Sequence, residues 1–227
     1  MADTIYDSLS DSQKELISKH LELVLEANKE TNLTRIDSIE SGTVLHVEDS
    51  LSALPEINQA PAGKYIDLGS GGGFPGIPIA VATGRKTTLL DARHKKVDLL
   101  NEFAHELGID KQVHAEHARI EEFSRKHLSQ YSVATARALA KLSVIMEFAS
   151  PLLKISGRLV CYKARIEEDE LKHAKKIANQ LGMRFESKRD FVLSDGETQR
   201  CIIVFEKVSK PKMKLPRHDG FAQKKPL

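Results

Sequence analysis

The sequence has few of the residues that cross-link a protein chain or anchor it in a membrane. It contains no tryptophan and only two cysteines in 227 residues, and aromatic residues make up 5% of it. Cys161 and Cys201 stand in the apolar runs LVCY and CIIVF, which favours two buried thiols but leaves a bridge between these segments open. No apolar run approaches the roughly 20 residues of a membrane span. The first residues, with Asp3, Asp7 and Asp11, include no hydrophobic signal-peptide core. We therefore expect a soluble, cytoplasmic protein that contacts no membrane.

The sequence also offers no recognisable metal site. His105, His114 and His117 have no companions at the spacing of metal ligands, so we expect them to be surface residues. Hydrophobic residues make up 41% of the chain, which is enough for a full core without metal or disulfide staples. We expect a protein that binds no metal.

The charge is almost balanced overall but unevenly distributed. The formal net charge is +2, with 34 Lys and Arg residues against 32 Asp and Glu residues. From Lys207 onward there are seven cations and one acid, Asp219, so this tail carries +6 and the rest of the chain −4. A basic tail on an acidic body is typical of a protein with a polyanionic partner. A solvated terminus that aids solubility explains the tail equally well.

The pattern of apolar residues divides the chain into three parts. Residues 1–63 form an N-terminal helical extension, with amphipathic helices over 11–30 and 42–53 and a loop over 56–63. Asp11 or Ser12 is expected to cap the first helix, with Glu15 completing a capping box. Residues 64–208 alternate between strands and helices, and residues 209–227 form the basic tail. Strands are predicted over 65–68, 87–91, 113–116, 132–136, 158–163, 184–192 and 199–208, and helices over 76–83, 95–107, 142–153 and 167–181.

This alternation predicts an α/β fold. Consecutive βα units indicate a mostly parallel sheet, here of about seven strands, with helices on both faces. The turn SDGE between the last two strands indicates a C-terminal antiparallel hairpin.

The glycine-rich stretch DLGSGGGFPGIP, residues 67–78, follows the first strand, where open α/β sheets bind ligands. It contains the dinucleotide pattern G-x-G-x-x-G, so NAD, S-adenosylmethionine and a turn without a ligand all compete. Gly69, Gly71, Gly72 and Gly73 together cost chain entropy that an ordinary turn does not require, which disfavours the last alternative. Pro75 and Pro78 remove amide donors where a pyrophosphate would bind. Asp67 at the strand end suits the cationic S-adenosylmethionine, which we therefore favour over NAD. The expected fold is then that of a Rossmann-like, S-adenosylmethionine-dependent methyltransferase.

Two further strand ends supply candidate partners for that cofactor. Asp91 follows the second strand and is placed to accept hydrogen bonds from both ribose hydroxyls. After the third strand, Arg119, Ile120 and Glu121 are expected to hold the adenine. Together with Gly69 and Gly71 these residues form the predicted cofactor site.

Several kinds of methyl-accepting atom are disfavoured because the residues that they require are absent from the expected positions in the sequence. Methylation of a ring carbon requires a nucleophilic cysteine, but Cys161 and Cys201 lie within predicted strands rather than at their ends. Exocyclic amines are usually held by an Asp/Asn-Pro-Pro-aromatic turn, whereas the fourth strand here leads into VATARALAK. A hydroxyl would require a general base, and none is evident. These absences favour a ring nitrogen, which needs positioning more than proton transfer.

Motifs along nearly the whole chain resemble the RsmG (GidB) family of small-subunit ribosomal RNA guanine-N7 methyltransferases. They are NLT at 32–34, HVEDS at 46–50, DLGSGGGFPGIP at 67–78, LLDARHKK at 89–96, RIEEF at 119–123, ARALA at 136–140, YK at 162–163 and ETQRCIIV at 197–204. The tail PRHDGFAQKKPL is similar to the extended tail of many members. The resemblance implies methyl transfer from S-adenosylmethionine to guanine N7 in the decoding region of 16S ribosomal RNA, free or in the small ribosomal subunit.

The resemblance also implies roles for individual residues. Gly69, Phe74, Ile120, Glu121 and Arg137 would line the cofactor site, with the Phe74 ring packed on the cofactor. Arg137 and Lys163 are the expected catalytic residues. The expected RNA contacts are His46, Lys95, Lys96, Lys163, Arg200, Lys214 and Arg217, and His46, Asp49 and Ser50 would close over the pocket. For His46 a purely structural role is equally compatible with the sequence.

Two positions depart from the family pattern, and two other functions stay open. Leu45 stands where the family usually has Arg, and Ala164 where it usually has Gly, which affects the expected RNA contacts rather than the cofactor loop. The alternatives are a small-molecule methyltransferase and an RNA-binding protein with a degenerate cofactor site. We expect the protein to act as a monomer.

Overall fold

The computed structural model describes residues 5–227, so Asp3 and its neighbours in the expected N-terminal extension lie outside it. The extension begins with the 3-10 helix η1 (Ile5–Ser8) and the long helix α1 (Asp11–Thr31). The capping box of α1 is formed by Ser10 and Gln13, so the predicted capping residues Asp11, Ser12 and Glu15 were wrong. The buried face of α1 includes Ile17, His20, Leu21 and Val24.

The second predicted helix, over 42–53, is a succession of short segments. They are α2 (Ile39–Gly42), the π-helical η2 (Thr43–Glu48) and α3 (Asp49–Leu51). A further helix, α4 (Leu54–Asn58), enters the predicted loop over 56–63, because Pro55 is compatible with the first turn of a helix. A π-helical turn changes the direction of side chains along a helix. In this protein it lies at the segment that carries His46.

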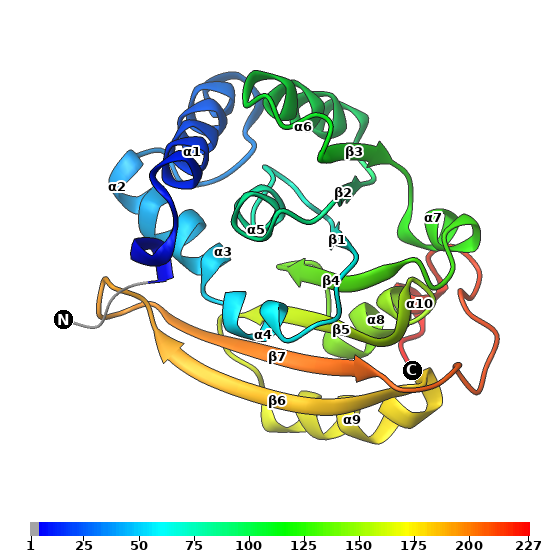
Figure 1. Cartoon of the computed structure of the whole chain (residues 1–227). Coiled ribbons are helices and arrows are strands. Elements are labelled where there is room, and N and C mark those ends of the chain that lie inside the picture. Colours follow the sequence, from blue (N-terminus) through cyan, green and yellow to red (C-terminus); the bar gives the residue numbers. More distant parts are fainter. Residues whose placement is uncertain (1–4) are drawn as a thin grey trace.

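The rest of the chain forms a seven-stranded sheet with the order β3-β2-β1-β4-β5-β7-β6 (Figure 1). All neighbours pair in parallel except β7, which is antiparallel to both β5 and β6. The predicted fold class is therefore confirmed, including the C-terminal hairpin. The strands are β1 (Lys64–Leu68), β2 (Thr87–Asp91), β3 (Val113–His117), β4 (Tyr131–Arg137), β5 (Leu153–Lys163), β6 (Met183–Val192) and β7 (Gln199–Lys207).

Helices cover both faces of the sheet, and alternate strand residues enter two separate cores. On one face, α5 (Gly76–Thr83) and α6 (His94–Glu106) pack together with α1, α3 and α4 (Figure 1). On the other face lie α7 (Ile120–Lys126), α8 (Leu142–Ala149), α9 (Glu168–Ala178) with the 3-10 turn η3 (Asn179–Leu181), and the short α10 (Phe221–Lys224). Tyr65 and Leu89 belong to the first core, Ile66 and Leu90 to the second. The domain boundaries expected at residues 63 and 208 stay predictions.

Further segments also differ from the predicted elements, among them β5, which begins five residues before the predicted strand 158–163. The predicted helix 142–153 ends at Ala149, because Pro151 follows and Leu153 already belongs to β5. Helix α7 was missed in the motif RIEEF, and α10 was missed in the basic tail. Cys161 and Cys201 are buried free thiols on β5 and β7, which confirms the favoured interpretation.

The topology places a crevice at the carboxyl ends of β1 and β4. The chain runs from β1 outward through β2 to β3, then returns to the other side of β1 with β4 and β5. Ligands of open α/β sheets bind at such a reversal. Within residues 5–227 no helix is long and apolar enough to cross a membrane.

Candidate functional site

The glycine loop after β1 is held by hydrogen bonds to the neighbouring strand β2. Gly69 and Gly71 adopt positive φ angles of 74° and 58°, which glycine tolerates far better than other residues. The Gly69 amide donates to the Leu90 carbonyl at 2.8 Å, and the Gly71 amide donates to Asp91 Oδ2 at 3.0 Å. Asp91 Oδ1 accepts from the Arg93 amide at 2.9 Å. The carboxylate of Asp91 thus joins β2 to the loop, and each oxygen keeps a second lone pair for a ligand.

A pocket of about 340 Å³, here called the β2 pocket, opens beside this loop at the ends of β1, β2 and β3. It brings together most of the residues predicted to bind the cofactor, and its volume is in the range of small-molecule sites. The residues that line it include Gly69, Leu90, Asp91, Lys96, Arg119, Ile120, Glu121, Ala138, Leu139 and Gln223. Sequence reasoning missed Ala138, Leu139 and Gln223, which come from the loop after β4 and from the C-terminal tail.

Asp67 lies beneath the loop and is not among the residues that line the β2 pocket. Its Oδ1 accepts a 2.6 Å hydrogen bond from Thr135 Oγ1, and within residues 5–227 its Oδ2 has no hydrogen-bond partner. Burial raises the pKa of this carboxyl from 3.8 to about 6. The predicted direct attraction between Asp67 and a cationic cofactor is therefore not supported by its position; the side chain supports the loop from below.

Phe74 is also placed differently from the prediction. Its ring is 4% exposed and lies between two imidazoles, with centroid distances of 4.3 Å to His20 and 4.5 Å to His46. His46 is parallel to the Phe74 ring within 6°. The ring thus packs in the core between α1 and η2 rather than on the wall of the β2 pocket.

Both histidines of this stack are held in the neutral form. Burial lowers the pKa of His20 to about 3, and burial together with the nearby Arg137 guanidinium lowers the pKa of His46 to about 3. Because arginine only donates, His46 Nδ1 accepts from Arg137 Nη2 at 3.2 Å. His46 Nε2 then carries the proton and donates to Thr34 Oγ1 at 3.0 Å. The imidazole therefore positions Arg137, and Thr34 of the NLT motif positions the imidazole.

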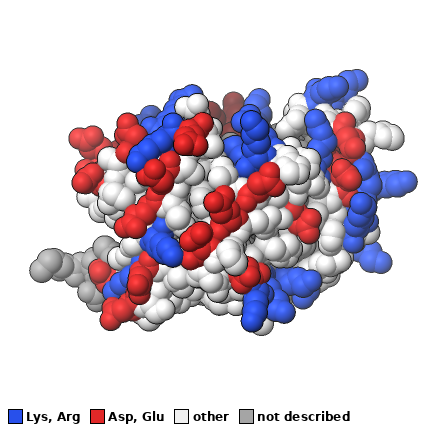
Figure 2. All heavy atoms as spheres, turned by 90° about the horizontal axis from the view of Figure 1, so that it is seen from above, with Lys and Arg blue, Asp and Glu red and all other residues white. Residues whose placement is uncertain are grey.

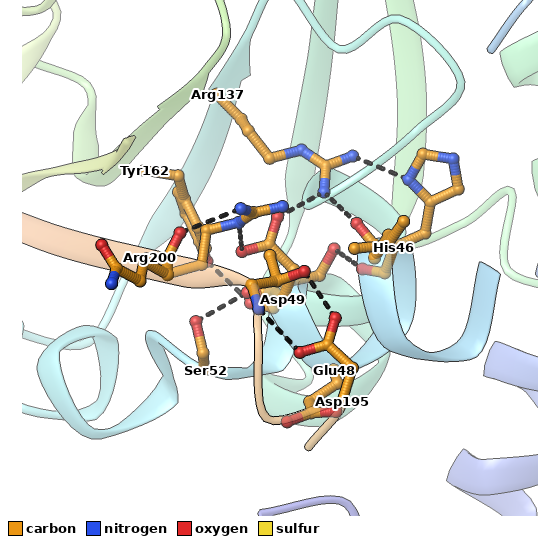
Figure 3. A network of polar contacts seen from close by, with 12 residues as sticks. His46, Glu48, Asp49, Ser52, Arg137, Tyr162, Asp195 and Arg200 are labelled. Atoms are coloured by element: carbon orange, nitrogen blue, oxygen red, sulfur yellow. Dashed lines mark hydrogen bonds and ion pairs between the residues drawn. The ribbon is translucent and has the colours of Figure 1, made fainter. Parts of the chain in front are cut away.

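A second pocket of about 460 Å³, here called the β4 pocket, lies at the ends of β4 and β5. The charged residues that line it come from four segments: Asp49 from α3, Arg137 from β4, Lys163 from β5 and Arg200 from β7. Arg137 Nη1 donates to Asp49 Oδ2 at 2.9 Å, and Arg200 Nε donates to Asp49 Oδ1 at 3.0 Å (Figure 3). The Asp49 side chain is 3% exposed, whereas the two guanidinium-bearing side chains are 18% and 20% exposed. One buried carboxylate thus holds two arginines that face the pocket.

The remaining walls of the β4 pocket are also held in place by hydrogen bonds. The buried Tyr162 hydroxyl donates to the Ser50 carbonyl at 2.7 Å. Lys163 Nζ donates to the Ala140 carbonyl at 2.9 Å and forms a 3.1 Å ion pair with Glu170. Leu45, the position that departs from the family pattern, contributes its carbonyl as a further acceptor for Arg137 at 3.2 Å.

The two pockets meet at the loop that follows β4. Ala138 lines both pockets and has a positive φ of 53°, an uncommon conformation for alanine. The Leu139 side chain packs directly against Gly69. A Cβ added at that glycine would lie 2.8 Å from Leu139 Cδ1, a separation at which one of the two groups would have to shift. This loop therefore separates a pocket that contains two acids, Asp91 and Glu121, from a pocket whose one acid, Asp49, is paired with two arginines.

The other predicted RNA contacts are not gathered in one place. Lys95 and Lys96 lie in the first turn of α6, where Lys95 is exposed and Lys96 lines the β2 pocket. Lys214 is exposed in the tail. The predicted RNA contact of Arg217 is not supported, because its guanidinium forms a bidentate ion pair with buried Glu147 of α8. A lone acid in the apolar helix LSVIMEFA was the sequence signal for that internal partner.

Comparison with known proteins places this geometry in a family. The model of the family described as rRNA small subunit methyltransferase G matches residues 13–199. The chain belongs to this family. Curated members include proteins of Alkaliphilus metalliredigens, with 34% identity over 96% of this chain and 92% of the relative, and of Lysinibacillus sphaericus, with 36% identity over 96% and 93%. Both are named ribosomal RNA small subunit methyltransferase G. The resemblance stated from the sequence motifs is thus confirmed.

Some solved structures share the fold of this chain, although their sequence identity to it is much lower than that of the curated relatives. Geranyl diphosphate C-methyltransferase from Streptomyces coelicolor, solved with S-adenosyl-L-homocysteine, has a TM-score of 0.56 at 15% identity and covers 70% of this chain and 78% of its own. The [4+2]-cyclase SpnF has a TM-score of 0.57 at 12% identity and covers 71% and 81%. Because one of these neighbours is a cyclase, the likeness shows a shared fold and not a shared activity.

Proposed function

We propose that the protein transfers the methyl group of S-adenosylmethionine to N7 of a guanine in 16S ribosomal RNA. The observation that carries the proposal is the pair of adjoining pockets that share Ala138. The β2 pocket has the acceptors that an adenosine requires, and the β4 pocket has the cations that an RNA backbone requires. The names of the family relatives support ribosomal RNA as the substrate.

The residues of the β2 pocket fit the cofactor by their chemistry. Asp91 has free lone pairs beside the Gly69–Gly71 backbone, which suits vicinal ribose hydroxyls. Ile120 offers an apolar surface and Glu121 a carboxylate on the same wall, which suits a purine. Bound there, S-adenosylmethionine would supply a methyl group on a positively charged sulfur, a leaving group that departs as a neutral thioether.

The β4 pocket supports a nucleophile that has its own lone pair. Cys161 and Cys201 are buried, with pKa values raised by burial to about 12 and about 11, so they are poor candidates for a covalent step. Both nitrogens of His46 already have hydrogen-bond partners. Tyr162 is buried and its pKa lies well above 10. A guanine N7 needs no proton removed before it attacks, so fixed geometry and the Arg137–Asp49–Arg200 group are sufficient.

The reaction places a new positive charge on the methylated base. We assign to Arg137 and Arg200 the positioning of the RNA phosphates around the target, and to Lys163 a phosphate or base contact at the pocket rim. The Asp49 carboxylate offsets the charge of the two arginines, and so lowers their repulsion of a cationic product. No step requires a metal, and within residues 5–227 no group of three or more His, Cys, Asp or Glu residues is placed to hold one.

The direct test uses ribosomal RNA that lacks the modification. The protein is incubated with methyl-labelled S-adenosylmethionine and either the free RNA or the small subunit, and N7-methylguanine is mapped by borohydride and aniline cleavage. We expect label at one guanine in at least one of the two substrates. Label on no RNA, with S-adenosylhomocysteine still bound in calorimetry, would favour a small-molecule methyltransferase. Absence of both would favour an RNA-binding protein with a degenerate cofactor site.

We also propose that the protein works as a cytoplasmic monomer. The support is geometric: distant segments of the one chain, which carry Asp49, Arg137 and Arg200, already meet in the β4 pocket. Light scattering coupled to size-exclusion chromatography should give a mass near 25.3 kDa. A mass of twice that value would refute the proposal.

A further inference from the structure

The basic tail is folded onto the protein rather than extended into solvent. It leaves β7 at Lys207 and returns along the face of the sheet covered by α7 and α8 (Figure 1). The Lys207 ammonium is buried and donates to Ser150 Oγ at 2.6 Å and to the Leu181 carbonyl at 3.0 Å. Figure 2 shows Lys and Arg side chains along the right-hand edge, the side on which Figure 1 places the tail. Only part of the tail's charge is thus available to a polyanion.

Three contacts anchor the end of the tail beside the β2 pocket. Arg217 Nε and Nη2 donate to the two oxygens of Glu147 at 2.6 and 2.5 Å, and the Glu147 side chain is 2% exposed. Asp219 forms an ion pair with Arg125 of α7. Ala222 is 1% exposed and belongs to the core beneath α8. Charged hydrogen bonds to a buried carboxylate are among the stronger polar contacts in proteins, so this anchoring is specific.

The anchored segment reaches the pocket at two points. The Gly220 amide donates to Glu121 Oε1 at 2.8 Å, and Glu121 is itself a buried residue of the pocket wall. Gln223, in α10, lines the same pocket from the tail side. A glutamine amide carries both donors and an acceptor, and the edge of adenine presents the complementary groups. The family model ends at residue 199, so these tail residues lie beyond it.

We propose that residues 217–223 form one wall of the cofactor site, with the Gly220 amide orienting Glu121 and with Gln223 contacting the adenine end of the cofactor. This inference rests on the cofactor site proposed above. It gives the tail a role that its charge did not indicate. The RNA contact expected of the tail is left to its exposed lysines, such as Lys212 and Lys214.

Binding of S-adenosylhomocysteine, measured by isothermal titration calorimetry without RNA, tests the proposal. Gln223→Ala removes an exposed side chain and should not unfold the protein. We expect it to weaken binding about 3- to 10-fold, the effect of one hydrogen bond. A chain that ends at residue 212 should bind more weakly still. The matched control, Lys212→Ala with Lys214→Ala, removes two charges from the same tail outside the pocket and should leave the Kd unchanged.

The outcomes separate this proposal from the one on which it rests. If the full chain binds S-adenosylhomocysteine and Gln223→Ala binds equally well, the tail is not part of the site and only this inference is overturned. If the full chain itself shows no binding, the cofactor assignment fails and takes this inference with it. If the lysine control weakens binding as much as Gln223→Ala, the tail acts through its charge, which also contradicts the proposal.

Discussion

The β2 and β4 pockets adjoin, but they hold their charged groups in opposite ways. In the β2 pocket, Asp91 and Glu121 each accept from backbone amides, so the acids are fixed by the main chain and stay open to a ligand. In the β4 pocket, charged side chains fix one another through Asp49. A site held by the main chain tolerates the loss of neighbouring side chains. A site held by a buried ion-pair network depends on every member.

The strongest test of this difference is Asp49→Ala. It leaves two arginines facing each other without their common carboxylate, and breaking a buried ion pair costs about 4 kcal/mol of stability. We expect a large fall in the urea midpoint and loss of methyl transfer to RNA, while the Kd for S-adenosylhomocysteine stays within about twofold. Asp37→Ala, at an exposed site, is the control. An equal loss of cofactor binding would mean that the two pockets do not form separate sites.

The second test concerns Asp67, the buried carboxyl group beneath the glycine loop. Asp67 titrates near pH 6 when folded and near 3.8 when unfolded, so between these values the folded protein binds the extra proton and its stability falls as pH rises. Asn does not titrate in this range, so Asp67→Asn abolishes this fall in stability with rising pH. We expect the stability of the variant relative to the parent to increase by about 2 kcal/mol from pH 4 to pH 7, measured by urea unfolding.

The histidines of the stack do not disturb that measurement. Because the pKa values of His20 and His46 are lowered to about 3, they make stability rise with pH up to about 6.5 in both proteins, and their contribution cancels in the difference. A difference that stays flat between pH 4 and pH 7 would show that Asp67 is ionised throughout this range in the folded protein.

The smallest expected effect belongs to the β2 pocket. Asp91→Ala removes the acceptor of the Gly71 amide and the proposed partner of the ribose, and we expect cofactor binding to weaken about 30-fold, which corresponds to about 2 kcal/mol. Because the loop keeps the Gly69–Leu90 hydrogen bond, the free energy of unfolding should fall by only about 1 kcal/mol. Asp98→Ala, on the exposed face of α6, should change neither quantity. A loss of stability as large as that of Asp49→Ala would erase the contrast between the pockets.

Local sequence patterns were sufficient for the sheet and for most of the β2 pocket. The strand over 87–91 was predicted with its observed ends, because the short run TTLL, with two β-branched residues, follows Gly84 and is ended by charged residues from Asp91 onward. Glycines at 69 and 71 and the acid at 91 belong to consecutive βα units, whose strand ends must meet at one edge. The helix 142–153 was predicted too long, since the apolar residues continue through Pro151 into β5 and hydrophobicity alone does not mark that boundary.

The amino-acid sequence by itself determined the family, the succession of strands along the chain and the residues at the strand ends, because these follow from local periodicity and from motifs a few residues long. Only the tertiary structure decided which of those residues face a pocket. Asp67 and Phe74 stand in the central motif and are buried under it. Asp49, Arg137 and Arg200 meet from segments up to 151 residues apart, and the basic tail ends as a wall beside Glu121. Such contacts depend on how helices pack across the sheet, which short-range patterns do not encode.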